Sequence, residues 1–142
     1  MPLTPASSLR IARVATVGID FGARRIGVAV SDSGEIATPH SVVRNEGDVI
    51  AKIANLGEQL GADLYVVGIA RDAQRFKDFA ERLRQRTCKE VVLWDEALTT
   101  VEAAEQLRAA GLKRRDAERE IDMQAATVIL QSYLDAQDRR VS

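Results

Sequence analysis

The stretch VGIDFGARRIGVAVSD, residues 17–32, places one carboxylate inside an apolar segment that has the pattern of a buried strand. Val17, Ile19 and Phe21 fall on one side of this strand, and Asp20 falls on the other. A buried carboxylate without a partner costs several kcal/mol, so Asp20 needs a counter-charge, a raised pKa or a function. This strand and the way it is continued decide both the fold and the site.

The segments around this strand predict a mixed α/β sheet. Three short strands joined by tight turns predict an antiparallel meander at residues 14–22, 26–31 and 36–43. Helical and apolar segments then alternate, which predicts two parallel strands, 63–69 and 90–94, with helices at 48–60 and 73–86. The expected fold class is therefore α/β, with a five-stranded mixed sheet flanked by helices.

Two more helices are expected in the last third of the chain. One begins after Thr99, where Thr99 and Glu102 have the spacing of a capping box, and it ends at Gly111. The last helix is predicted over 117–136. The charged stretch LKRRDAERE, residues 112–120, has little that could anchor it to a core, and we expect it to be mobile in the free protein.

Length and composition favour one globular domain. The 142 residues are 46% hydrophobic, and we expect a flexible leader at 1–13 followed by a single domain at 14–138. The net charge of −1 excludes a generally basic nucleic-acid-binding surface, so any basic site must be local. Because Cys88 is the only cysteine and no membrane span or signal peptide is apparent, we expect a cytoplasmic protein.

Acids occur in three elements where the pattern expects apolar or small residues. Besides Asp20 in the first strand, Asp95 and Glu96 end the last strand, and Asp122 lies within the apolar stripe of the last helix. Each has an ordinary explanation when taken alone: a salt bridge to an arginine, a cap, or an acid at a solvent-facing strand end. Three of them on neighbouring elements instead indicate a carboxylate cluster.

Carboxylates that lie close together need cations, and hard oxygen ligands suit Mg²⁺ or Mn²⁺. His40 is the only histidine, so a zinc site or a Ser-His-Asp triad is poorly supported. A paired Mg²⁺ site activates water for attack on a phosphodiester. We therefore predict Asp20, Glu96 and Asp122 as catalytic metal ligands. Asp95 is expected in a supporting role or as the alternative ligand, because strand alternation lets only one of the two adjacent acids share the face of Asp20.

Basic residues close to these acids are the candidates for phosphate contact. Two follow Asp20 directly and four precede or begin the last helix: Arg24, Arg25, Lys113, Arg114, Arg115 and Arg119. Such residues would hold a nucleic-acid backbone without reading its sequence. The alternative is a solvated charged loop.

The sequence resembles the YqgF family, also called RuvX-type, which consists of Holliday-junction-resolvase-like proteins regarded as pre-16S rRNA nucleases. The resemblance rests on VGIDFGARRIGVAVSD, VVLWDEALTTVEAAEQL and IDMQAATVILQSYLD, which occur in this order between Val17 and Asp135. It implies a ribonuclease H-like fold, acids at Asp20, at the Asp95–Glu96 pair and at Asp122, and a hydrolase that acts in ribosomal RNA maturation or on branched DNA.

The chain departs from the family pattern at two places. Ala97 stands where such proteins usually have arginine, and the loop after Ile69 is shortened. Both changes remove residues expected to contact the substrate. They keep open a non-catalytic nucleic-acid-binding factor with the same fold.

The partner predicted from these features is structured RNA (pre-rRNA) or branched DNA. Junction resolution would require a homodimer, because a four-way junction presents two symmetric cleavage positions. An actin-like ATPase shares the GIDFG opening, but it would need a second domain and a second phosphate loop, and neither is recognisable in the sequence.

Overall fold

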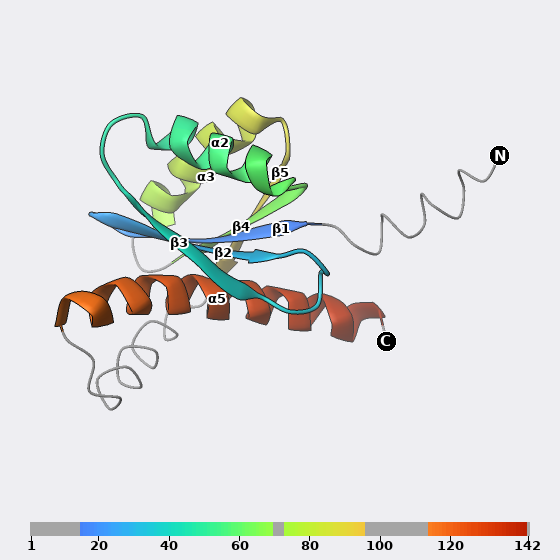
Figure 1. Cartoon of the computed structure of the whole chain (residues 1–142). Coiled ribbons are helices and arrows are strands. Elements are labelled where there is room, and N and C mark those ends of the chain that lie inside the picture. The colour runs from blue at the N-terminus through green and yellow to red at the C-terminus, as the bar shows by residue number, and fades with distance from the viewer. Residues whose placement is uncertain (1–14, 70–72, 96–113, 142) are drawn as a thin grey trace.

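The computed structural model describes residues 15–69, 73–95 and 114–141, and the side chains of residues 15–69, 74–95 and 121–137 within them. The strands are β1 (Thr16–Phe21), β2 (Arg25–Ser31), β3 (Thr38–Arg44), β4 (Leu64–Ile69) and β5 (Glu90–Asp95). The helices are α2 (Val49–Leu60), α3 (Ala73–Thr87) and α5 (Arg114–Val141). Figure 1 shows them as one layer of sheet between two layers of helix. The predicted leader 1–13 and the predicted helix after Thr99 lie outside the described residues.

The five strands form a single mixed sheet in the order β3-β2-β1-β4-β5. β1 pairs antiparallel with β2, and β2 pairs antiparallel with β3. β4 joins β1 on its other side in parallel, and β5 joins β4 in parallel. The predicted meander and the two predicted parallel strands are thereby confirmed, as is the α/β class.

The last helix is longer than the sequence pattern predicted. α5 begins at Arg114 and ends at Val141, so most of the charged stretch that we expected to be a loop is helical. Arginine, alanine and glutamate are good helix formers, and a run of charges on such residues lengthens a helix as readily as it makes a loop. No helix in the described ranges, α5 included, is both long and apolar enough to span a bilayer.

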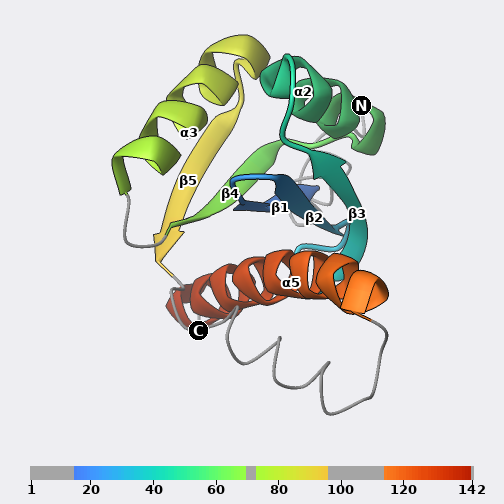
Figure 2. The same cartoon turned by 90° about the vertical axis from the view of Figure 1, so that its left-hand side faces the viewer.

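The helices cover both faces of the sheet. In Figure 2, α2 and α3 lie above the sheet and α5 runs below it. The face under α2 and α3 holds the larger core, in which Val17 and Ile19 of β1 pack with Val67 of β4 and Leu83 of α3. The face towards α5 holds a smaller cluster around Ala29, Val66, Ile129 and Leu130. The sides predicted for Val17 and Asp20 on β1 follow this division.

Three glycines on the α5 face let the helix approach the sheet closely. A Cβ at Gly27 would lie 1.9 Å from the backbone oxygen of Asp122, and one at Gly18 would lie 2.6 Å from the Cβ of Leu130. At Gly68 it would lie 2.4 Å from Cδ1 of Ile129. No side chain fits at these distances, so the absence of one at Gly18, Gly27 and Gly68 sets the spacing between sheet and helix.

Candidate active site

Asp20 lies near the carboxyl end of β1, between two glycines. It is in register with Gly27 of β2 and with Gly68 of β4, and the same row continues to Trp94 of β5. Gly27 and Gly68 meet α5, and the indole Nε1 of Trp94 donates to Ser132 Oγ of α5 at 3.1 Å. Asp20 therefore points to the α5 face, where its two neighbours in the row have no side chain to shield it.

The second carboxylate comes to Asp20 from the helix. The backbone of Asp122 packs directly on Gly27, which is the β2 partner of Asp20. The side chain of Asp122 is 19% exposed. The close approach at Gly27 thus brings together two acids that are far apart in the sequence.

The pKa of Asp20 records this crowding. Burial and, second to it, the nearby charge of Asp122 together raise the pKa of its carboxyl from 3.8 to about 6. Burial is the larger cause. A carboxyl in this state holds its proton into the mildly acidic range unless a cation relieves the repulsion.

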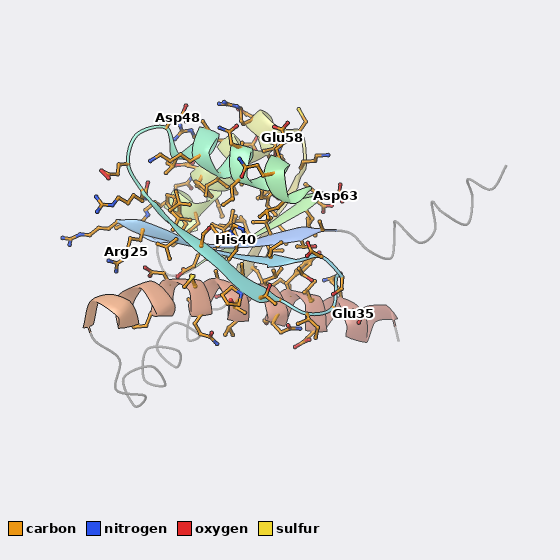
Figure 3. All side chains as sticks on the ribbon, viewed as in Figure 1. Arg25, Glu35, His40, Asp48, Glu58 and Asp63 are labelled. Carbon is orange, nitrogen blue, oxygen red and sulfur yellow. The ribbon has the colours of Figure 1, made fainter. Side chains whose placement is uncertain are left out.

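Arg25 holds Asp122 in place. Its Nε donates to Asp122 Oδ2 at 2.6 Å, across a sequence separation of 97 residues. Arg25 is the first residue of β2, two positions before Gly27, so its side chain points to the same face as Asp20. Figure 3 shows it at the end of the sheet above the first half of α5. The structure shows Arg25 in an internal ion pair, and the phosphate contact expected from the sequence stays a prediction.

Of the two adjacent acids at and after the end of β5, the structure describes Asp95 but not Glu96. Leu93 packs in the core under α2 and α3, whereas Trp94 contacts α5. Because side chains alternate along a strand, Asp95 is on the same face of the sheet as Leu93, opposite to Asp20, and it is exposed. Glu96 lies outside the described residues.

The residues present suit a divalent cation. The carboxylates of Asp20 and Asp122 interact in a partly buried place, where burial and, second to it, their mutual repulsion raise the pKa of Asp20. Carboxylate oxygens are the donors that Mg²⁺ and Mn²⁺ prefer, and a cation would relieve this repulsion. Within the described ranges, no group of three or more Asp, Glu, His or Cys side chains could hold a metal. A third acidic ligand would have to come from elsewhere in the chain.

The other predicted phosphate-binding residues differ in how much of them the structure describes. Arg24 is exposed in the turn between β1 and β2, close to the acids. Arg114, Arg115 and Arg119 belong to the first turns of α5, but their side chains are not described. Lys113 lies outside the described residues.

Comparisons with known proteins agree on one family. A family model described as RuvX, Holliday junction resolvase, matches residues 14–136. A protein of Nitratidesulfovibrio vulgaris named "Putative pre-16S rRNA nuclease" is 37% identical over 135 residues, which covers 87% of this chain and 95% of that protein. The protein of the same name from Mycobacterium tuberculosis is 43% identical over 131 residues, covering 84% of this chain and 77% of the relative.

Solved structures share the fold at much lower sequence identity. The fowlpox virus resolvase in complex with Holliday junction DNA superposes with a TM-score of 0.59 at 7% identity, covering 87% of this chain and 99% of the other. RuvC of T. thermophilus in complex with a Holliday junction gives a TM-score of 0.55 at 16% identity, covering 88% and 96%. These likenesses identify the fold as ribonuclease H-like.

Proposed function

The chain belongs to the RuvX family of Holliday junction resolvases, and we propose that it is a metal-dependent endonuclease that processes the 5′ end of pre-16S rRNA in the cytoplasm. Family membership makes it a hydrolase of phosphodiester bonds. One observation in the structure carries the proposal: Asp20 and Asp122 are brought together on the α5 face, where burial and mutual repulsion raise the pKa of Asp20 to about 6.

The proposed metal ligands are Asp20, Asp122 and Glu96, with Mg²⁺ or Mn²⁺ as the cation. When bound there, the cation supplies a water molecule activated for attack on the phosphodiester and neutralises charge on the phosphate. Glu96 is preferred to Asp95 as a ligand because side chains alternate along a strand. Trp94, two positions before Glu96, contacts α5, whereas Asp95 is on the opposite face of the sheet. Asp95 is left with a supporting role.

The remaining residues position the acids and the substrate. Arg25 holds the Asp122 carboxylate through the 2.6 Å contact, which fixes the direction of its oxygens. Arg24 and the basic residues around the start of α5, Lys113, Arg114, Arg115 and Arg119, are proposed to contact substrate phosphates.

RNA is preferred to a DNA junction as substrate. The two relatives described above, at 37% and 43% identity, are named for pre-16S rRNA, whereas the resolvases bound to Holliday junctions are 7% and 16% identical. Junction resolution remains the second candidate because the family model itself is described by that activity. It would require two copies of the site in a homodimer.

The decisive experiment offers the purified protein two substrates in parallel: a pre-16S rRNA fragment containing the 5′ processing site, and a four-way DNA junction. We expect cleavage of the RNA with Mg²⁺ or Mn²⁺, and none with EDTA. The Asp20→Asn variant should be inactive, and Asp135→Asn, which changes an exposed acid of α5, should be active. Cleavage that survives EDTA would refute the metal mechanism, and cleavage of the junction alone would favour the second candidate.

The choice of the third ligand needs its own measurement. Mn²⁺ binding by calorimetry should be lost in Glu96→Gln and largely kept in Asp95→Asn. The reverse result would place Asp95 in the metal site.

A further inference from the structure

A groove in which three of the six described lining residues are arginines includes Arg25, the residue that holds Asp122. It has a volume of about 420 Å³ and lies between the β1–β2 turn and the end of β3. Its lining consists of Ala23, Arg24, Arg25, Arg44, Asn45 and Glu46. The lining carries three positive charges and one negative charge, which favours an anion.

The sheet register places two of these arginines opposite each other. Arg25 of β2 is paired with Arg44 of β3, and like charges directly opposite on antiparallel strands destabilise a sheet. Asp122 balances Arg25. Within the described part of the chain, Arg44 forms an ion pair with Glu46, at 3.4 Å, and its side chain is 82% exposed, so this contact contributes little. Among these residues, the charge of Arg44 therefore has little stabilising role.

Hydrogen bonds hold the two walls of the groove together. Asn45 donates from Nδ2 to the Gly22 carbonyl at 2.8 Å and from its backbone N–H to the Arg24 carbonyl, also at 2.8 Å. They tie the end of β3 to the β1–β2 turn and so fix the positions from which Arg24 and Arg44 extend. The side chain of Arg24 makes no hydrogen bond or ion pair with the described part of the chain.

Arg25 connects the groove to the acids. It lines the groove and also holds Asp122, the neighbour of Asp20. A chain of phosphates lying in the groove would therefore continue to the carboxylates. None of the described residues that line the groove is aromatic, so base stacking has no support among them, and the arginines suit the phosphates of any nucleotide sequence.

We propose that this groove binds the phosphate backbone of the substrate strand next to the cleaved bond, with Arg44 and Arg24 as the contacting residues. The inference rests on the proposed nuclease function, and it adds Arg44 and the β3 end of the groove to the substrate-binding surface. Arg44 lies outside the motifs that carry the family resemblance.

Binding of a fluorescently labelled single-stranded RNA in EDTA tests the groove apart from cleavage. We expect the Arg24→Gln/Arg44→Gln variant to bind on the order of tenfold more weakly at low salt. The slope of log affinity against log salt should fall by about 1.4, the value for two lost phosphate contacts on a single strand. The matched control is Arg82→Gln/Arg86→Gln, which removes the same charge from exposed positions on α3. It should leave affinity within about twofold, because such exposed charges lie outside the groove.

The outcomes separate this proposal from the nuclease proposal. If the wild-type protein cleaves RNA but the two double variants bind RNA alike, the groove is refuted and the nuclease stands. If the wild-type protein cleaves neither substrate while only the Arg24/Arg44 variant loses RNA binding, the groove stands as an RNA site and the nuclease fails. The Tm of Arg44→Gln should equal or exceed that of wild type, since a repulsive pair is removed. A lower Tm with unchanged RNA binding would overturn the proposal by assigning Arg44 to the fold.

Discussion

The two faces of the sheet are built from different residues. Under α2 and α3, β1 and β2 present fully buried aliphatic side chains, and Phe21 stacks on Phe79 with ring centroids 4.3 Å apart. Towards α5, the same two strands present Gly18, Gly27 and Asp20. Successive residues of one strand thus serve two purposes.

The difference shows where a fold of this size can place charge. A face filled by large side chains keeps its helices at a distance and excludes water. A face without them lets a helix backbone approach, so the acid on the helix can reach the acid on the strand. The second arrangement lowers stability, because the crowded Asp20 has a raised pKa.

The largest effect is expected from removing the charge of Asp20. With the pKa raised from 3.8 to about 6, its contribution to stability is greatest below pH 3.8 and is lost as the pH rises through 6. Ionised Asp20 should therefore cost the fold at most about 3 kcal/mol above pH 6. Asp20→Asn should be inactive, yet more stable than wild type at pH 8, with a smaller difference near pH 4.

Urea unfolding across this pH range measures the effect, with Asp135→Asn as the control. Added Mn²⁺ should reduce the difference in unfolding free energy between Asp20→Asn and wild type at pH 8, because it stabilises the ionised wild type. A difference in unfolding free energy that does not change with pH would contradict the raised pKa of Asp20.

Adjacent residues on β2 offer a direct test of the two faces. Gly27→Ala inserts a Cβ against the Asp122 backbone and should destabilise by about 1–3 kcal/mol while abolishing Mn²⁺ binding. Val28→Ala removes volume from the other face, where Val28 is fully buried, and should cost on the order of 2 kcal/mol. It should nevertheless bind Mn²⁺ normally. Calorimetric titration of both variants with Mn²⁺, below their unfolding temperatures, tests this prediction. Equal loss of Mn²⁺ binding in the two variants would mean that the two faces of the sheet are not independent.

A smaller effect is expected from the ion pair that joins the sheet to α5. Arg25→Gln removes the ion pair between Arg25 and Asp122, and because Arg25 is 41% exposed we expect the free energy of unfolding to fall by only about 1 kcal/mol. Arg84 pairs with Glu81 on the solvent side of α3, and Arg84→Gln should change stability less. Chemical unfolding of both variants at pH 7 compares the pairs, and a larger effect at Arg84 would contradict the role given to Arg25.

The sequence predicted most of the fold because its signals are local. Alternation in residues 17–32 places Asp20 on the face opposite to Val17 and Ile19, and turn residues separate the strands of the meander. The order of strands and helices then leaves few topologies. The start of α5 was missed because charged residues satisfy both a loop and a helix, and the pattern of Arg114 to Glu120 contains no apolar stripe to distinguish them.

Within the candidate site, residue periodicity is enough to show which acids stand at apolar positions. Which groups meet depends on how the strands and α5 pack together. Arg25 reaches Asp122 across 97 residues, and Arg44 faces Arg25 through a strand register that a bulge near Val28 shifts. Gly27 matters because the Asp122 backbone lies where its Cβ would be. Periodicity shows on which side of an element a residue lies, but a distance between two elements depends on how their surfaces dock, and that is a property of the whole packed chain.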